Sequence, residues 1–274
     1  MKKRNYGVSP LCLALVELIR QLAREVIMPS YLKAARSHKA DGSLCTETDI
    51  AAQAWLAERL PVFAELPALG EEMTPEEQRL TWEQSSDGLW IIDPIDGTTN
   101  FVNGIPFFTT SVALYRNQRP VIGVVYNPAT EEAFYAEKGC GAYLNGMRLP
   151  LRPAHPDLKQ AVAGIDFKRI PRELADRLAT QPPFFSQRHF GSSCLEWCYI
   201  AAGRLDVYLH GGQMLWDYAA GRLIVEEAGG AFCSLEQGDF DAASPWKRSV
   251  VAAATPRLHR QWTAALAGEP PLIV

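Results

Sequence analysis

The sequence predicts an α/β protein, more narrowly of α+β type, in which N-terminal helices precede an antiparallel sheet and a layered α/β half. Three observations predict this order. Apolar residues recur at helical spacing near the N-terminus. Strand-like runs separated by turn signals fill residues 89–146, and helix-like and strand-like segments alternate after residue 150.

The first segment predicts two helices. The spacing of apolar residues indicates an amphipathic helix over 9–37. The basic start resembles a signal peptide, but charged residues interrupt the apolar run and no small-residue cleavage site follows. A second helix is expected over 47–60, where Thr46 and Asp49 nearly form a capping box. The spaced apolar residues of the first helix are Leu11, Leu15, Leu18, Leu22 and Val26.

The middle of the chain predicts an antiparallel meander. A short strand at 66–70 leads into the letters GEE, and turn signals such as Asn127-Pro128 separate the runs that follow. We expect strands at 89–93, 107–116, 120–127, 132–137 and 142–146.

The second half of the chain has a different sequence pattern. A proline-rich stretch, LPLRPAHPDL, marks a boundary near residue 150. We therefore divide the chain into 1–150, with the N-terminal helices, the antiparallel sheet and most candidate ligands, and 151–274, a smaller α/β half. Strands are expected at 161–166, 185–190 and 205–209, and helices at 171–179, 192–203 and 216–228.

Composition narrows the class of function. The 274 residues carry a net charge of −4 without a basic run, so we expect no nucleic-acid partner. No apolar segment is long enough to span a membrane, so no membrane partner is expected. The six cysteines include no C-x-x-C pair, which argues against a disulfide framework or a zinc site and favours a cytoplasmic setting.

The stretch WIIDPIDGTTNF, residues 90–101, carries the strongest chemical signal. An apolar strand ends by bringing Asp93 and Asp96 together, and two close carboxylates repel unless a proton or a cation lies between them. Gly97 permits a tight turn that can also aim the carbonyl of Ile95 at the same cation. Oxygen ligands indicate Mg²⁺ or Mn²⁺. From these residues alone, an aspartate-rich turn that caps a helix remains an equal alternative.

Further acids stand at similar positions. Glu71 and Glu72 directly follow a glycine, although in isolation they read as surface acids. Asp217 opens the segment WDYAAGRLIVEEAGG, whose small residues let a helix pack closely and whose two final glycines end it. A helix cap is the alternative role for Asp217.

These motifs carry a family resemblance. WIIDPIDGTTNF followed by GIPFF, together with WDYAAGRLIVEEAGG, resembles the two signatures of the inositol monophosphatase family of metal-dependent, lithium-sensitive phosphatases. Segments at 39–52, 123–146 and 188–209 are also similar to family segments. The resemblance implies an αβαβα layered sandwich with the catalytic site between its halves, and a homodimer.

The resemblance also implies a metal site of about two or three Mg²⁺ ions, for which Mn²⁺ can substitute. Asp93 is shared between the two principal ions. Lys39 and Asp49 match positions near a weaker third ion, with a surface lysine and a helix cap as their respective alternatives. The implied ligands are Glu71, Asp93 and the Ile95 carbonyl for the first ion, and Asp93, Asp96 and Asp217 for the second.

Catalytic roles follow from the same resemblance. Thr98, with Glu71, positions and deprotonates the attacking water, while Gly97 and Thr98 offer backbone N–H groups to the phosphate. Asp93 is catalytic through the metals, and Asp217 also borders the substrate. Gly191, Ser192 and Ser193 match residues of the substrate pocket, with serine capping of a helix as the alternative.

Position 210 departs from the family. Seven residues before Asp217, the family's inositol phosphatases have a glutamate that contacts sugar-alcohol hydroxyls, whereas this chain has His210. An imidazole can donate or accept a hydrogen bond there. The inositol substrate is thereby placed in doubt, but phosphate hydrolysis is not.

The expected function is therefore Mg²⁺-dependent hydrolysis of a small phosphate monoester, inositol monophosphate or a related polyol or sugar phosphate, by metal-activated water. Two alternatives of the same superfamily remain, a 3′(2′),5′-bisphosphate nucleotidase and a fructose-1,6-bisphosphatase. A regulatory metal-binding protein is the alternative outside enzymes.

Overall fold

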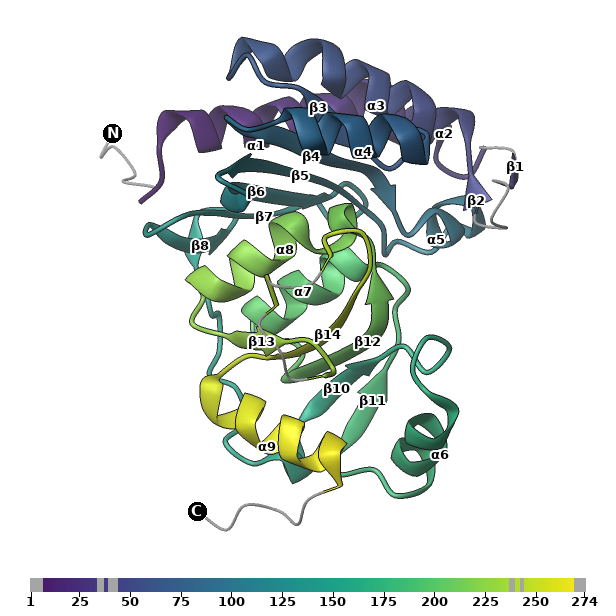
Figure 1. Cartoon of the computed structure of the whole chain (residues 1–274), viewed down its shortest axis with the longest axis vertical. Coiled ribbons are helices and arrows are strands. Elements are labelled where there is room, and N and C mark those ends of the chain that lie inside the picture. The colour runs from purple at the N-terminus through teal and green to yellow at the C-terminus, as the bar shows by residue number, and fades with distance from the viewer. Residues whose placement is uncertain (1–6, 34–36, 39–43, 237–239, 242–243, 269–274) are drawn as a thin grey trace.

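Layers of helices and sheets alternate as α, β, α, β and α along the long axis of the molecule (Figure 1). The computed structural model describes residues 7–33, 37–38, 44–236, 240–241 and 244–268. The αβαβα arrangement implied by the family resemblance is confirmed.

The first layer contains α1 (Pro10–Leu22) and α3 (Glu47–Arg59). Helix α1 continues through a π-helical turn into the short α2 (Met28–Ser30). The expectation of one helix to residue 37 was wrong: Tyr31 has an extended ψ of 133° and Leu32 a φ of 68°. The apolar spacing that predicted the helix had already ended at Val26. Helix α3 begins as predicted, with a complete capping box between Thr46 and Asp49.

The second layer is a seven-stranded sheet of order β3-β4-β5-β6-β7-β8-β9. Strand β3 pairs parallel to β4 and every later neighbour is antiparallel, so the predicted meander is confirmed. Its strands are β3 (Ala68–Gly70), β4 (Leu89–Asp96), β5 (Thr109–Arg116), β6 (Arg119–Asn127), β7 (Glu132–Glu137), β8 (Gly141–Leu144) and β9 (Met147–Arg148).

Two helices and a pair of short strands accompany this sheet. Helix α4 (Pro75–Gln84) was not predicted, although Thr74 and Glu77 form the capping box that could have revealed it. The six-residue α5 (Thr98–Asn103) follows the acidic turn. The two-residue strands β1 (Ser37–His38) and β2 (Leu44–Cys45) pair antiparallel.

The fourth layer is a five-stranded sheet of order β11-β10-β12-β14-β13. Strand β10 pairs parallel with β11 and with β12. Strand β12 extends beyond the predicted 205–209, and the last two strands and α9 were not predicted. The strands are β10 (Val162–Ile165), β11 (Ser186–Arg188), β12 (Val207–Gln213), β13 (Ala231–Cys233) and β14 (Arg248–Ala253). The helices are α6 (Arg172–Thr180), α7 (Ser193–Ala201), α8 (Leu215–Glu227) and α9 (Pro256–Ala267).

Three apolar cores lie between the layers. Strand β4 is buried on both faces: Trp90 and Ile92 pack toward α1 and α3, while Leu89 and Ile91 pack toward α7 and α8. The third core lies on the far side of the smaller sheet, under α6 and α9. Helices α7 and α8 therefore fill the space between the sheets, as Figure 1 shows, and the acidic end of β4 lies at this middle layer.

Candidate functional site

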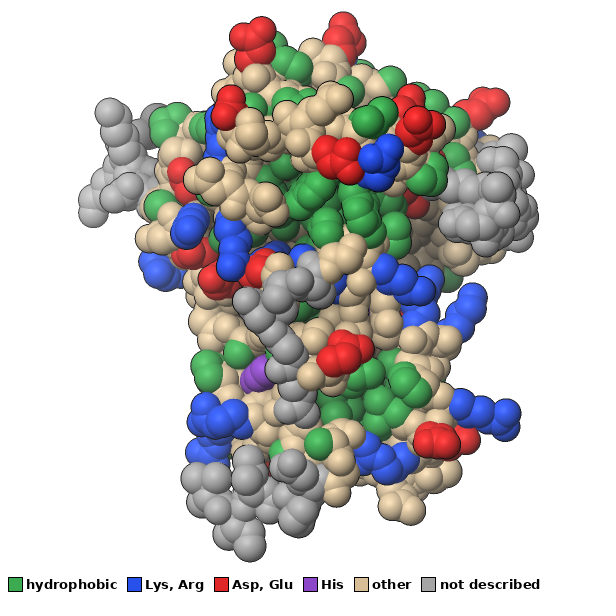
Figure 2. Space-filling view, viewed as in Figure 1, with side chains coloured by type: hydrophobic (Ala, Val, Ile, Leu, Met, Phe, Trp, Pro, Cys, Tyr) green, Lys and Arg blue, Asp and Glu red, His purple; other side chains and the backbone are tan. Residues whose placement is uncertain are grey.

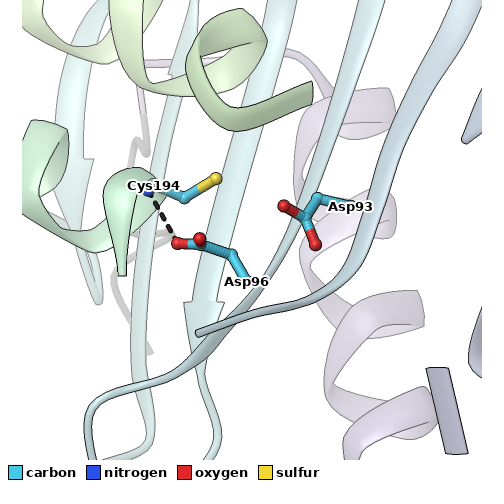
Figure 3. Close-up of side chains that lie close together, drawn as sticks. All are labelled: Asp93, Asp96 and Cys194. Atoms are coloured by element: carbon cyan, nitrogen blue, oxygen red, sulfur yellow. Dashed lines mark hydrogen bonds between the residues drawn. The ribbon is translucent and has the colours of Figure 1, made fainter. Parts of the chain in front are cut away.

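Asp93 and Asp96 lie close together near the end of β4. The β4–β5 pairing is regular as far as Asp93, opposite Ser111, and shifts register before Asp96, opposite Thr109. This irregularity lets both carboxylates approach the same point. Ligand atoms of Asp93, Asp96 and Cys194 all lie within 4.8 Å of one another. Figure 3 shows the three side chains next to each other.

Asp93 is the most unusual group of the site. Its side chain is fully buried, and neither carboxylate oxygen has a hydrogen-bond partner within the part of the chain that the structure describes. Burial raises its pKa well above the ordinary value, and the nearby carboxylates add to the shift. A carboxylate with both oxygens unpartnered fits a bound cation, and an all-oxygen environment fits Mg²⁺. The carboxylates that raise this pKa are Glu71, Asp96, Asp217 and Asp49.

Asp96 is held by the first turn of α7, in the other half of the chain. The Ser192 hydroxyl donates to it over 2.5 Å, and the backbone N–H groups of Cys194 and Ser193 donate over 2.7 and 3.2 Å. Burial raises the pKa of Asp96, and these hydrogen bonds oppose the rise. Ser192 is the N-cap residue of α7, but its hydroxyl binds Asp96 and does not cap its own helix.

Asp217 is in the first turn of α8. Its carboxylate accepts the backbone N–H of Met214 over 2.8 Å, so it caps the helix. Its backbone lies beside the acidic cluster, since the Cys194 thiol contacts the Asp217 carbonyl over 3.3 Å. Burial, and then the charges of Asp96 and Glu71, raise the pKa of Asp217 well above the ordinary value. The capping role is therefore observed, while the role of Asp217 as a metal ligand stays a prediction.

Glu71 follows β3 and stands beside the acidic strand. Its backbone N–H donates to the Ile92 carbonyl over 3.2 Å, which continues the parallel pairing of β3 with β4. Glu71 is not part of the tight group of Asp93, Asp96 and Cys194, but its charge acts on Asp93 and on Asp217.

Thr98 connects the acidic turn to the first helical layer. Its hydroxyl lies 3.0 Å from the Ile95 carbonyl oxygen and 3.3 Å from Asp49 Oδ1. Asp49 meanwhile accepts the Thr46 N–H over 2.8 Å through its other oxygen. The capping role of Asp49 therefore leaves one oxygen directed at the site.

Gly97 and Gly191 explain how the two halves meet so closely. Gly97 has a φ of 87°, and a Cβ there would lie 3.1 Å from the Gly191 carbonyl oxygen. Gly191, with a φ of 80°, is likewise in the left-handed region that favours glycine. The structure thus brings Gly191, Ser192 and Ser193 to the acidic turn.

His210 is turned toward other protein groups. Its Nδ1 accepts the Gly212 N–H over 3.2 Å, and its Nε2 lies 3.3 Å from Asp166 Oδ2. The side chain is 4% exposed, so both ring nitrogens are engaged inside the protein. Lys39, the remaining predicted residue, lies outside the described residues.

Cys194, which the sequence analysis did not single out, lies beside the two aspartates. It is fully buried, and its thiol donates toward the Asp217 carbonyl over 3.3 Å. Burial, together with the carboxylates of Asp96, Asp93 and Asp217, raises its pKa well above the usual value. A neutral thiol is a poor ligand for a hard cation, so Cys194 lines the cluster without adding charge. No sequence signal reveals this position, because only the packing of α7 on β4 creates it.

Comparison with known sequences gives a consistent result. The model of the inositol monophosphatase family matches residues 8–269. The Nus factor SuhB of Pasteurella multocida is 41% identical over 184 residues, which cover 65% of this chain and 67% of that protein. Inositol monophosphatase 2 of Solanum lycopersicum is 36% identical over 229 residues, covering 80% and 85% of the two chains.

Solved structures share the fold. An IMPase of Thermotoga maritima superposes with a TM-score of 0.80 at 28% identity, covering 93% of this chain and 96% of that one. The extragenic suppressor protein suhB of Bartonella henselae also reaches 0.80 at 28% identity, covering 94% and 98%.

Proposed function

Because the chain belongs to the inositol monophosphatase family, we propose that it hydrolyses a small phosphate monoester in a Mg²⁺-dependent reaction. The observation that supports this most directly is Asp93, buried without hydrogen-bond partners in the described structure and surrounded by further carboxylates. Inositol monophosphate and related polyol or sugar phosphates are the nearest substrates. Hydrolysis by an activated water needs no covalent phospho-enzyme.

The residues that would hold the metal come from both halves of the chain. Glu71, Asp93 and the Ile95 carbonyl would bind one Mg²⁺, and Asp93, Asp96 and Asp217 a second. Asp49, with Lys39, borders the place for a third. Bound Mg²⁺ offsets the charge of the phosphate and lowers the pKa of a coordinated water.

The side chains around the metals would position the reactants. Thr98, oriented by the Ile95 carbonyl and Asp49, would hold the attacking water, and Glu71 would accept its proton. The backbone N–H groups of Gly97 and Thr98 would hold the phosphate oxygens. Phosphoryl transfer proceeds through a loose transition state, so this positioning and the charge compensation carry most of the catalysis.

The remaining expectations concern the state of the protein. We propose a cytoplasmic homodimer, with the segment Gly191–Ser193 lining the substrate pocket beside Asp96. Among the described residues, no helix combines the length and apolar character needed to cross a membrane.

A regulatory role is the second candidate. It is favoured by two relatives, from Pasteurella multocida and Haemophilus influenzae, which are both 41% identical and named Nus factor SuhB. On the face shown in Figure 2, Lys and Arg are interspersed with Asp and Glu and form no continuous basic stripe. A regulatory role would not require turnover, so a substitution of Asp93 would leave it intact.

The test is phosphate release from a panel of substrates, each with Mg²⁺ and with EDTA. The panel contains inositol 1-phosphate, other polyol and sugar monophosphates, fructose 1,6-bisphosphate and adenosine 3′,5′-bisphosphate. We expect Mg²⁺-dependent release from at least one compound. Absence of release from all of them, in a chain shown by calorimetry to bind Mg²⁺, would refute the proposed substrate class and favour the regulatory role.

A further inference from the structure

A pocket of about 290 Å³ lies beside α8. Its walls come from α4, the turn after β5, the N-terminal half of α8 and the segment between β13 and β14. Tyr115 in this pocket pairs with Leu89, whereas Asp93 pairs with Ser111. Four residues of a strand span about 13 Å, so the pocket lies at the opposite end of the β4–β5 pairing from the acidic cluster. None of the described residues that line it belongs to that cluster.

Three arginines bind one carboxylate in this pocket. Arg222 donates through both terminal nitrogens to Asp241, with 3.0 Å between Nη2 and Oδ2. Arg119 Nη1 donates to the same Oδ2, and Arg248 Nη1 lies 3.7 Å from Oδ1. Glu226, whose charge also acts on Arg222, is exposed on α8 and does not line the pocket. The described lining therefore carries three positive charges and one negative charge.

Aromatic rings hold two of the guanidinium groups in place. Arg222 and Arg248 are 3% and 7% exposed, and their Cζ atoms lie 5.2 and 5.0 Å from the centre of the Phe240 ring. Arg248 Cζ also lies 5.2 Å from the centre of the Tyr218 ring. Burial lowers the pKa of Arg222, although a guanidinium stays charged at neutral pH. The positive charges are therefore fixed in position and depend on an anion to offset their burial.

Two buried hydrogen-bond donors of the pocket lack an acceptor. The Tyr115 hydroxyl and Arg222 Nε have no hydrogen-bond partner within the part of the chain that the structure describes, and neither atom is accessible to solvent. Both residues line the same pocket. Burial raises the pKa of Tyr115, so its hydroxyl keeps its hydrogen. Arginines already bind both carboxylate oxygens of Asp241, so the two donors require an acceptor that the described lining does not supply.

We propose that this pocket binds the phosphate group of a small organic phosphate, which takes the place of the Asp241 carboxylate on the three arginines. A phosphate dianion offsets more of the positive charge than a carboxylate does, and its additional oxygens can accept the hydrogens of the Tyr115 hydroxyl and Arg222 Nε. Neither donor is accessible to solvent with Asp241 in place, so the ligand replaces the carboxylate and does not bind beside it. Trp82 and Leu215 offer an apolar surface to the organic part. This inference does not depend on the proposed function.

The test measures phosphate binding by calorimetry on the full chain, freed of divalent ions with a chelating resin. Without metal, the acidic cluster repels phosphate, so the signal comes from the arginines. The probes are inorganic phosphate and phenyl phosphate, with acetate as a carboxylate and NaCl at equal ionic strength as a control for screening. Tyr115→Phe and Arg119→Gln are compared with Arg79→Gln. The Arg79 side chain on α4 is 54% exposed, against 51% for Arg119, pairs with Glu83 and does not line the pocket.

We expect Tyr115→Phe and Arg119→Gln to weaken phosphate binding by about 10- to 100-fold, because each removes a hydrogen bond to a charged group. Arg79→Gln should change the affinity by less than about 2-fold, because its charge is exposed and screened. Phenyl phosphate should bind more tightly than inorganic phosphate, since its ring covers apolar surface, and acetate should bind more weakly than either. Asp241→Asn should strengthen phosphate binding, because it weakens the internal competitor for the arginines.

Tyr115→Phe should be at least as stable as the parent chain without ligand, because it removes a buried hydroxyl that has no partner among the described residues. Thermal unfolding in NaCl therefore separates lost binding from lost folding. The assignment would be overturned by a parent chain that binds no phosphate, by unchanged affinity in both Tyr115→Phe and Arg119→Gln, by an equal loss in Arg79→Gln, or by equal binding of acetate. Weaker phosphate binding in Asp241→Asn would overturn the replacement of the carboxylate. None of these measurements requires turnover, so the proposed function is tested separately.

Discussion

The Ser192 hydroxyl, at the start of α7, donates a 2.5 Å hydrogen bond to the Asp96 carboxylate at the end of β4. The two residues come from different halves of the chain, and both are buried. Together with the N–H groups of Ser193 and Cys194, this hydrogen bond fixes the orientation of the Asp96 carboxylate. The second half of the chain therefore orients a candidate metal ligand of the first half.

Ser192→Ala should weaken Mg²⁺ binding without unfolding the protein. The two backbone donors would remain on Asp96, but the carboxylate would lose its hydroxyl partner. Losing such an outer partner typically lowers metal affinity by about 10- to 100-fold. Calorimetric titration with Mg²⁺ measures the effect, with Thr180→Ala on the exposed part of α6 as a control. Unchanged affinity would show that the hydroxyl does not orient a ligand.

Asp93→Asn should reduce phosphate release to the level of the EDTA-treated parent chain. Without metal, the variant should be at least as stable as the parent, because the amide removes a buried charge from a repulsive cluster. Turnover assays and thermal unfolding in EDTA test both statements. Retained activity would contradict the metal assignment, and a large loss of stability would assign Asp93 a structural role.

Lithium should inhibit the reaction in competition with Mg²⁺ at millimolar concentration. Li⁺ is a hard cation that takes oxygen ligands, but its single charge compensates less of the phosphate charge than Mg²⁺ does. Rates measured across Mg²⁺ concentrations with LiCl, and with NaCl at equal ionic strength, separate competition from screening. Indifference to LiCl would count against a lithium-sensitive site.

Glu196 should make the metal-free protein less stable as the pH rises. This glutamate on α7 is 1% exposed, and burial raises its pKa from 4.5 to about 7. Between these values the folded chain retains a proton that the unfolded chain has released, so the free energy of unfolding falls with increasing pH. The full shift corresponds to at most about 3 kcal/mol.

Glu196→Gln should remove this part of the pH dependence. Urea unfolding in EDTA at about pH 5 and about pH 8 compares the two proteins. The aspartates of the acidic cluster, Asp93, Asp96 and Asp217, contribute a slope of the same sign in both proteins. Because both proteins share every other titrating group, the difference between them isolates Glu196. Parallel stability profiles would show that Glu196 titrates in the folded protein as it does in the unfolded chain.

Gly221→Val should destabilise the fold by about 1–3 kcal/mol through overpacking. A Cβ at Gly221 would lie 2.5 Å from the Cβ of Trp197, so α8 cannot keep its distance from α7 with a larger residue. Ala51→Val, at an exposed position of α3, controls for the lower helix propensity of valine. Equal unfolding free energies for the two variants would show that the helices can separate at little cost.

Much of the fold could be predicted because local patterns and tertiary packing agree. The alternation of apolar runs and turn signals identified the meander, and the small residues of α8 correctly indicated close helix packing. The long first helix was overestimated because the prediction extended beyond Val26, the last residue of its apolar pattern. Helix α4 was not predicted despite its capping box, since its sequence is mostly polar and only Gln78 is buried, so it has no apolar stripe.

The residues of the site also fall into two groups, those that a local sequence pattern predicts and those that only the tertiary packing brings together. Asp93 and Asp96 at the end of β4 could be predicted, because two closely spaced carboxylates that end a buried strand are themselves a local pattern. Cys194 could not be predicted, because it reaches the cluster only through the packing of α7. The partners of His210 were equally hidden: Asp166 is on a neighbouring strand end, and only parallel pairing brings the two together.

The shared middle layer has a consequence for biosynthesis. The inner face of the first sheet, including Leu89, Ile91 and Ala113, is covered by α7 and α8, which leave the ribosome much later. Until then, the nascent chain exposes an apolar sheet face and an acidic turn that lacks Asp217. The first half therefore cannot cover its apolar sheet face until the second half has been synthesised, and the proposed metal site is complete only after Asp217 has been translated.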